Sequence, residues 1–226
     1  MSDALSIRSL SFAYPGSSWC LSVDALDVAA GEQVLLTGGS GRGKSTLLHL
    51  VAGLENPDAG TVRVAGTDIH GLRGAKRDLF RGRHVGMIFQ TFNLLHGFSA
   101  LENVMAALMF SAVPRREHRQ RARGLLEQLG IERIGASPTE LSIGQQQRVA
   151  VARALVVEPA LVLADEPTAS LDPENTVAAM TMIQDACRER NAALLCVSHE
   201  PVMRDRFPRR HTLDELAPAG AAKGGA

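Results

Sequence analysis

Apolar and polar residues alternate in two segments near the start of the chain, at residues 5–12 and 21–28. A repeat of two is typical of β-strands that bury one face. Pro15 and Gly16 lie between these segments, and both residue types favour tight turns. The pattern therefore predicts two antiparallel strands joined by a turn.

Later apolar segments are continuous instead of alternating, and they cover residues 34–37, 160–164 and 193–197. Uninterrupted apolar runs of this length are typical of strands buried on both faces of a parallel sheet. Further strands are expected at 61–65 and 85–89, and helices at 45–52, 174–190 and 201–206.

Between residues 100 and 130 the pattern changes to a helical one. The very apolar segment 101–110 precedes an arginine-rich amphipathic segment that ends before Gly130, a residue suited to a helix C-terminus. Strands and helices alternate on both sides of this block, which predicts an α/β core with an N-terminal antiparallel β subdomain and an inserted α-helical subdomain at about 91–158. We expect residues 1–216 to form this single domain and 217–226 to form a disordered tail.

Composition narrows the class of protein. The 226-residue chain is 45% hydrophobic and 21% charged, which is ordinary for a soluble globular protein. Its formal net charge is zero, so no overall positive field favours nucleic acid. We see no secretory signal and no apolar run long enough to cross a membrane. The cysteines, Cys20, Cys187 and Cys196, form no Cys-x-x-Cys pair and are expected to be reduced thiols, two of them in or near the core.

A glycine-rich loop lies between the expected strand at 34–37 and the expected helix at 45–52. It comprises Gly38, Gly39, Ser40, Gly41, Arg42, Gly43, Lys44 and Ser45, followed by Thr46, and fits the pattern G-x-x-x-x-G-K-[ST]. In such loops successive N–H groups surround a phosphate, the lysine reaches the β- and γ-phosphate oxygens, and the serine hydroxyl ligates Mg²⁺. The loop predicts a nucleotide–Mg²⁺ site.

Acidic residues follow the apolar strand at 160–164. Asp165 is suited to hold the Mg²⁺ shell through water, and Glu166 is the expected general base for an attacking water. His199 follows the segment 193–197, at a strand end where α/β sheets place their ligands, so contact with the γ-phosphate is favoured over a purely structural role.

Two further candidates carry weaker signals. Gln90 follows the segment 85–89, and its amide oxygen is a possible Mg²⁺ ligand. Tyr14 is the only tyrosine, and its ring is a candidate to stack on adenine, with simple packing as the alternative.

The segment Leu141–Gln145 reads Leu-Ser-Ile-Gly-Gln and lies 20 residues before Asp165. It predicts a helix start with Ser142 as N-cap, and Gly144 there permits close backbone approach. Free N–H groups at a helix N-terminus bind anions. The chain therefore offers a second phosphate-binding surface, although one nucleotide needs only one.

Together these residues resemble the ATP-binding subunit of ABC transporters, over about residues 5–205. The segment 38–45 resembles the Walker A loop, 161–166 the Walker B strand with its catalytic glutamate, and 141–145 the signature motif. Tyr14, Gln90, Ser170–Asp172 and His199 match the A-, Q-, D- and H-loops. The resemblance implies a P-loop ATPase that binds ATP and Mg²⁺, with catalytic roles for Lys44, Gln90, Glu166 and His199. It implies Mg²⁺ contacts from Ser45, Gln90 and Asp165, and nucleotide contacts that include Ser142, Gly144, Gln145 and Asp172.

The segments 49–60, 93–104 and 163–168 resemble more closely the lipoprotein-release, macrolide-export and FtsE-like branch. This likeness implies an integral-membrane permease partner and a peripheral location on the cytoplasmic face of a bacterial inner membrane. It also implies export or extraction of a lipid, lipoprotein or hydrophobic compound. No nucleic-acid partner is expected.

Two departures from the family pattern accompany the resemblance. Ile143 stands where the signature motif usually has glycine, and a β-branched residue would be strained there if the position required positive φ. Residues 207–216 lack the usual glycine-containing final hairpin, so the C-terminal strand is expected to be short or absent.

The surplus phosphate surface predicts an ATP-bound homodimer, in which each nucleotide lies between the loop 38–45 of one subunit and the helix start at 142–145 of the other. The apolar segment 101–110 is either subdomain core or part of a groove for a permease helix. The arginine run at 115–123 is either a solvated helix face or a contact for anionic lipid.

Other functions stay open at this point. The same cassette fits a mechanotransmission complex that regulates a cell-envelope enzyme without transport. A soluble ABC ATPase acting on nucleic acid is less favoured, because the chain has no tandem cassette or broad basic surface. A P-loop kinase would leave Leu141–Gln145 unexplained.

Overall fold

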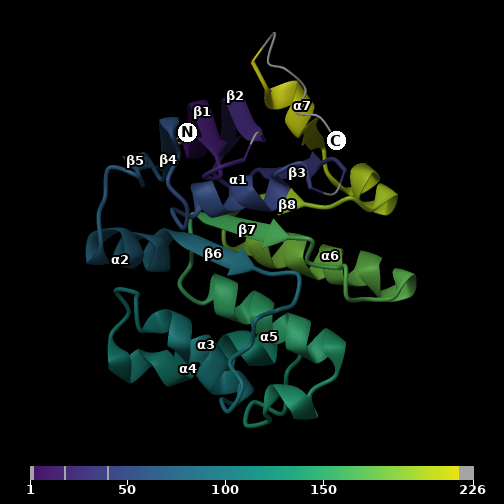
Figure 1. The fold of residues 1–226 in the computed structure, drawn as a ribbon. Coiled ribbons are helices and arrows are strands. Elements are labelled where there is room, and N and C mark those ends of the chain that lie inside the picture. The colour runs from purple at the N-terminus through teal and green to yellow at the C-terminus, as the bar shows by residue number, and fades with distance from the viewer. Residues whose placement is uncertain (1–2, 18, 40, 219–226) are drawn as a thin grey trace.

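The computed structural model describes residues 3–17, 19–39 and 41–218. Within these residues the chain forms two sheets and the helices that cover them (Figure 1). One predicted feature, the tail at 217–226, lies outside the described residues from position 219 onward.

A parallel sheet forms the centre of the molecule. Its strands, in spatial order, are β6 (Val85–Ile88), β7 (Leu161–Asp165), β8 (Ala193–Val197), β3 (Gln33–Thr37) and β9 (Arg209–Thr212). Each neighbouring pair is parallel, as the continuous apolar runs predict. The expectation of a short C-terminal strand is met by β9, which has four residues.

The second sheet is antiparallel and contains the two strands predicted from alternation. Its spatial order is β2 (Cys20–Ala29), β1 (Asp3–Ala13), β4 (Ala59–Val64) and β5 (Thr67–Asp68). In β1 the residues Leu5, Ile7, Leu10 and Phe12 are buried, so the alternating pattern marks the face that turns to the core.

The helices have the following bounds: α1 (Lys44–Val51), α2 (Ala75–His84), α3 (Ala100–Leu108), α4 (Arg115–Gln128), α5 (Ile143–Leu155), α6 (Pro173–Glu189) and α7 (Leu213–Leu216). Short 3₁₀ helices are η1 (Pro138–Glu140) and η2 (Pro201–Arg206). Helix α2 was not among the elements predicted from the sequence; five of its ten residues are Lys, Arg or Asp, and none of its residues is fully buried.

Alternate residues of the central strands face two different cores. Leu35, Ile88 and Cys196 belong to a cluster with α3, α4, α5 and α6. Val34, Leu163 and Leu195 face the opposite way, toward α1 and the antiparallel sheet. The parallel sheet is thus the middle layer, with the helices of segment 100–155 below it in Figure 1 and β1, β2 and β4 above it.

The cysteines lie as expected, since all are free and both Cys187 and Cys196 are buried. Burial raises the pKa of Cys187 to about 12, and burial also raises the pKa of Cys196. Neither is therefore a thiolate near neutral pH. In the part of the chain that the structure describes, no helix combines the length and apolar character needed to span a bilayer.

Candidate active site

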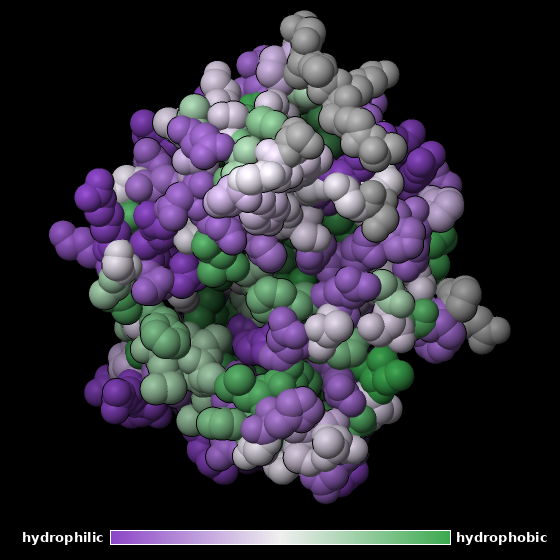
Figure 2. All heavy atoms as spheres, viewed as in Figure 1, coloured by the Kyte–Doolittle hydropathy of each residue, from purple (hydrophilic) through white to green (hydrophobic). Residues whose placement is uncertain are grey.

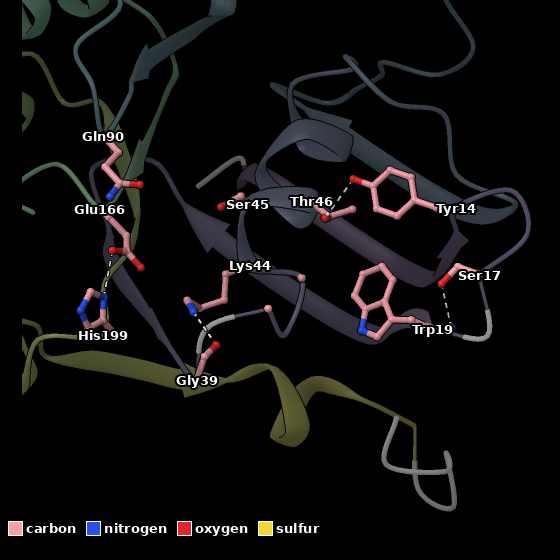
Figure 3. A pocket seen from close by; sticks show the side chains of 12 residues that line it. Tyr14, Ser17, Trp19, Gly39, Lys44, Ser45, Thr46, Gln90, Glu166 and His199 are labelled. Atoms are coloured by element: carbon pink, nitrogen blue, oxygen red, sulfur yellow. Dashed lines mark hydrogen bonds and ion pairs between the residues drawn. The ribbon is translucent and has the colours of Figure 1, made fainter. Parts of the chain in front are cut away.

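The carboxyl ends of the parallel strands meet at one edge of the sheet, where α/β proteins bind their ligands. A cavity of about 810 Å³ opens there. Its lining is Tyr14, Ser17, Trp19, Gly39, Gly41, Gly43, Lys44, Ser45, Thr46, Gln90, Glu166 and His199. These residues come from five separate segments of the chain, and Figure 3 shows their side chains around one cavity. The structure thus brings together predicted residues that are far apart in the sequence.

The glycine-rich loop between β3 and α1 has the backbone of an anion cradle. Gly38, Gly41 and Gly43 have φ values of +151°, +74° and +92°, a region that favours glycine over residues with a Cβ. Lys44 is buried, and its Nζ donates to the carbonyls of Gly38 and Gly39 at 2.9 and 2.8 Å. The ammonium group therefore lies inside the curve of the loop.

Two predicted loop residues differ from these. Ser40 lies outside the described residues, and the Arg42 side chain is exposed and absent from the described cavity lining. The structure therefore gives Arg42 no position that points to a nucleotide contact.

The predicted Mg²⁺ ligands lie beside the loop. Ser45 Oγ donates to Asp165 Oδ1 at 3.0 Å, so a hydroxyl from α1 and a carboxylate from β7 converge although 120 residues separate them. Gln90 adds an amide at the same cavity. These oxygen donors fit Mg²⁺, which prefers hard oxygen ligands and keeps part of its water shell.

Glu166 and His199 form a pair at the ends of β7 and β8. His199 Nδ1 lies 2.9 Å from Glu166 Oε2 (Figure 3). The side chain of Glu166 is only 19% exposed, whereas its backbone has φ +44°, a left-handed conformation that non-glycine residues rarely adopt. Its N–H donates to the carbonyl of Val197 at 3.0 Å, so the neighbouring strand helps to fix this turn.

The end of the cavity away from Glu166 is aromatic. The hydroxyls of Tyr14 and Thr46 lie 3.2 Å apart, and the Tyr14 ring packs edge-on against Phe12 at 4.8 Å. Trp19 lies next to Tyr14, with ring centroids 6.1 Å apart. Trp19 belongs to none of the sequence motifs, but the pairing of β1 with β2 brings its segment across from Tyr14.

The helix start predicted at Ser142 is present. Ser142 caps α5, its Oγ accepts from the N–H of Gln145, and Gln145 Oε1 accepts from the N–H of Ser142. The cap thus satisfies the N–H of Gln145, whereas the N–H groups of Ile143 and Gly144 have no acceptor inside the helix because they lie in its first turn. A second cavity, of about 520 Å³, lies here, and its lining includes Ser142, Gly144 and Asp172.

The condition under which Ile143 would be strained, a positive φ, is not met. Ile143 is the first residue of α5, and it is not among the residues with positive φ. A β-branched residue fits this helical position, and its side chain is 53% exposed at the second cavity. The departure from glycine therefore changes the surface and leaves the helix start intact.

Hydrogen bonds tie the predicted loops to one another. Ser170 Oγ donates to the carbonyl of Gln90 at 3.2 Å, and Gln147 Nε2 donates to the carbonyl of Pro167 at 2.8 Å. Arg153, on α5, donates to the carbonyls of Phe92 and Asn93. Burial lowers the pKa of Arg153 from its usual value. The helix start at 142–145 is thus connected through α5 to the loops that line the first cavity.

A third, more apolar cavity of about 500 Å³ lies between α2 and the end of α3, and we call it the α2–α3 groove. It is lined by Leu54, Asp78, Arg81, Gly82, Val85, Met87, Phe89 and Phe110. Figure 2 shows apolar surface gathered at this level of the molecule, below α2. Within the segment 101–110, Val104 and Leu108 are buried in the core, as one of the two expectations has it, whereas Phe110 is 52% exposed and lines the groove.

Comparison with protein families and curated proteins gives a consistent result. The ABC transporter family model matches residues 21–169. The lipoprotein-releasing system ATP-binding protein LolD of Chromohalobacter salexigens is 43% identical over 191 residues, which is 84% of this chain and 81% of that protein. LolD 2 of Caulobacter vibrioides is 47% identical over 175 residues, or 77% of each chain.

The fold is also similar to solved structures. A dimeric post-hydrolysis state of the ATP-binding cassette MJ0796, bound to ADP and Pi, superposes with a TM-score of 0.79. Its sequence is 30% identical, and the match covers 92% of this chain and 93% of that one.

Proposed function

The chain belongs to the ABC transporter family as an ATP-hydrolysing subunit, and we propose that it hydrolyses ATP between two copies of itself to drive a membrane permease that extracts lipoproteins. The observation that carries the proposal is the pair of cavities with different linings, one built around Lys44 and Glu166 and the other around Ser142. Within this proposal residues 1–216 act as one ATPase domain.

The first step is the binding of the phosphates. The loop N–H groups and Lys44 Nζ hold the β- and γ-phosphates, because the loop curves around the ammonium group. Ser45 Oγ, Gln90 and Asp165 would hold Mg²⁺, directly or through its water shell. The bound ion would supply positive charge that offsets the charge of the phosphates.

The second step is the activation of water. The Glu166 carboxylate faces the cavity and accepts a proton from the attacking water as general base. His199 holds this carboxylate through Nδ1, so the histidine fixes the direction in which the base points. Tyr14 stacks on the adenine ring and holds it at the end of the cavity away from Glu166.

Dimerisation follows from the second cavity. The N–H groups at the start of α5 are suited to bind the γ-phosphate of a nucleotide held by the partner subunit. Ser142, Gly144, Gln145 and Asp172 supply this surface. The γ-phosphate then contacts both subunits, and its loss on hydrolysis weakens the dimer, because only the triphosphate makes both sets of contacts.

The permease and its substrate are inferred from relatives. Proteins named as lipoprotein-releasing system ATP-binding subunits match over most of this chain. The α2–α3 groove offers an apolar surface for a cytoplasmic helix of the permease. We therefore propose that the subunit acts at the cytoplasmic face of the bacterial inner membrane.

The test uses Glu166→Gln, which keeps the shape of the side chain and removes its basicity. We expect ATP hydrolysis to fall by about 10²–10⁴-fold and the variant to accumulate as an ATP-bound dimer, measured by gel filtration with light scattering in Mg²⁺ and ATP. The double variant Glu166→Gln/Lys44→Ala is the matched control and should stay monomeric. A purely monomeric Glu166→Gln with ATP bound would contradict the scheme.

A further inference from the structure

Strand register places the single tryptophan of the chain beside Tyr14. Phe12 pairs with Leu21 in β1 and β2, and Ala13 pairs with Cys20. Continuing this register by one residue on each side would set Tyr14 opposite Trp19, and their ring centroids do lie 6.1 Å apart. Cross-strand partners share a face of the sheet, so both rings project on the side of Phe12 and Leu21.

The hairpin turn fixes the backbone on which Trp19 stands. The N–H of Ser17 donates to the carbonyl of Tyr14 at 3.0 Å, which closes the turn. The N–H of Trp19 donates to Ser17 Oγ, also at 3.0 Å. Trp19 therefore enters β2 from an anchored position.

The indole reaches the phosphate loop. A Cβ built at Gly43 would lie 2.4 Å from Trp19 Cζ2, so the ring occupies space that only glycine leaves open. Trp19 is also partly buried against the core cluster that includes Leu21. Trp19 thus spans the gap between the hairpin and the N-terminus of α1.

The two rings are nearly parallel to each other. Their planes differ by 22° with centroids 6.1 Å apart, and Figure 3 shows both ring faces turned the same way at the end of the cavity beside Thr46. The hydrogen bond between Tyr14 and Thr46 holds the first ring, and contact with Gly43 holds the second.

We propose that Trp19 is a second base-stacking residue of the nucleotide site, so that the purine and ribose lie on a platform of two rings. The phosphates are committed to the Lys44 end of the cavity, and the remaining lining at the other end is Tyr14, Ser17 and Trp19. An indole offers the largest aromatic face of any side chain, and nucleobases stack on such faces. This role rests on the ATP site proposed above.

The test separates stacking from mere support of the loop. Calorimetric titration compares Mg²⁺-ATP with Mg²⁺-tripolyphosphate, which has the phosphates but no base. Trp19→Ala should bind ATP about tenfold more weakly, whereas Trp19→Phe should stay within about threefold of the wild type. Tripolyphosphate should bind all three proteins alike.

Two results would overturn the proposal. One is unchanged ATP affinity in Trp19→Ala. The other is an equal loss of tripolyphosphate affinity, which would show that the ring only supports the loop. Lys44→Ala is measured in parallel as a test of the ATP site on which this proposal rests. If this variant bound ATP as tightly as the wild type, the proposed ATP site itself would be wrong, independently of Trp19.

Fluorescence gives an independent readout, since Trp19 is the only tryptophan. Saturating ATP should change the emission of the wild-type protein, and tripolyphosphate should change it much less. Equal changes with both ligands would count against a contact between the base and the indole.

Discussion

At the scale of single residues, the proposed mechanism depends on the contact between Glu166 and His199. Glu166 is mostly shielded from solvent, and His199 lies 2.9 Å from one of its oxygens. The histidine itself is 59% exposed, so it is accessible to a phosphate in the same cavity. We propose that His199 orients Glu166 as the general base. Loss of His199 should therefore reduce ATP hydrolysis more than it reduces ATP binding.

His199→Ala should therefore slow ATP hydrolysis by about 10²-fold or more, because the general base loses its orientation. The affinity for ATP should change little, since Lys44 and the loop N–H groups are untouched. Steady-state phosphate release and equilibrium titration with ATP measure the two quantities separately.

His96→Ala is the matched control, because His96 is an exposed histidine outside the described cavity lining. It should keep wild-type turnover. Equal losses of ATP affinity and turnover in His199→Ala would show instead that the residue acts in binding.

Sequence predicts most of this site because its residues follow strand ends or lie in one glycine-rich loop. The loop pattern gives Lys44 and Ser45, and the ends of apolar runs give Asp165, Glu166 and His199. Trp19 has no motif because a stacking residue needs only an exposed ring face, and its neighbours in the sequence can vary. Its position next to Tyr14 becomes visible only when the pairing of β1 with β2 is known.

Helix α5 has the central position at the scale of elements. Its N-terminus forms the second cavity, its middle contacts the loop after β7 through Gln147, and Arg153 near its C-terminus binds the loop after β6. Close packing of α5 on β6 makes these contacts possible. At Gly86 an added Cβ would lie 2.3 Å from the carbonyl oxygen of Ala154.

Gly86→Ala should accordingly destabilise the protein by about 1–3 kcal/mol, because the backbone of α5 must move away from the strand. Urea unfolding followed by circular dichroism measures the free energy of unfolding. The expected lower midpoint would be accompanied by weaker ATP hydrolysis, since the loops held by α5 shift with it.

Gly124→Ala is the opposite case and serves as its control. Gly124 lies inside α4, and apart from the adjoining backbone of that helix no described atom lies within 4 Å of a Cβ added there. Alanine should stabilise the helix by about 0.5–1 kcal/mol. If both variants were equally destabilised, contact with α5 would not be the cause.

The elements were predictable wherever burial is one-sided or complete. Alternation gives β1 and β2, and continuous apolar runs give β3, β7 and β8. Helix α2 was not predicted, because its segment is short, highly charged and has no fully buried residue. Whether Ile143 is strained depended on the sign of its φ, which the sequence does not show; in the structure the position has the backbone of a helix start.

At the scale of the whole molecule, the proposed functions of nucleotide binding, dimerisation and permease binding belong to three separate cavities. The nucleotide cavity and the cavity at the start of α5 have no described lining residue in common, which is the geometry expected when a second subunit completes each site. The α2–α3 groove is separate from both. The arginines of α4 are largely exposed or paired with acids such as Glu127 and Glu158, which fits a solvated helix face.

Phe110→Asp should weaken permease binding by about 30-fold or more, as expected when an anchor residue of an apolar groove is lost. ATP affinity should stay at the wild-type value, because the groove is distinct from the nucleotide cavity. Co-purification with the permease from detergent-solubilised membranes measures the first, and calorimetry the second.

Met109→Asp is the neighbouring control, since Met109 is 69% exposed and outside the described groove lining. It should retain the permease. Equal retention by Phe110→Asp would place the permease contact elsewhere on the cassette.

The left-handed backbone of Glu166 has a consequence for the evolution and engineering of the whole chain. A non-glycine residue in this conformation costs about 1–2 kcal/mol relative to ordinary backbone, and glycine or asparagine would relieve part of that cost. Thermal stability and turnover therefore favour different residues at one position. Selection of variants for thermal stability alone, without a screen for activity, would therefore favour replacements of Glu166 that stabilise the fold and abolish ATP hydrolysis.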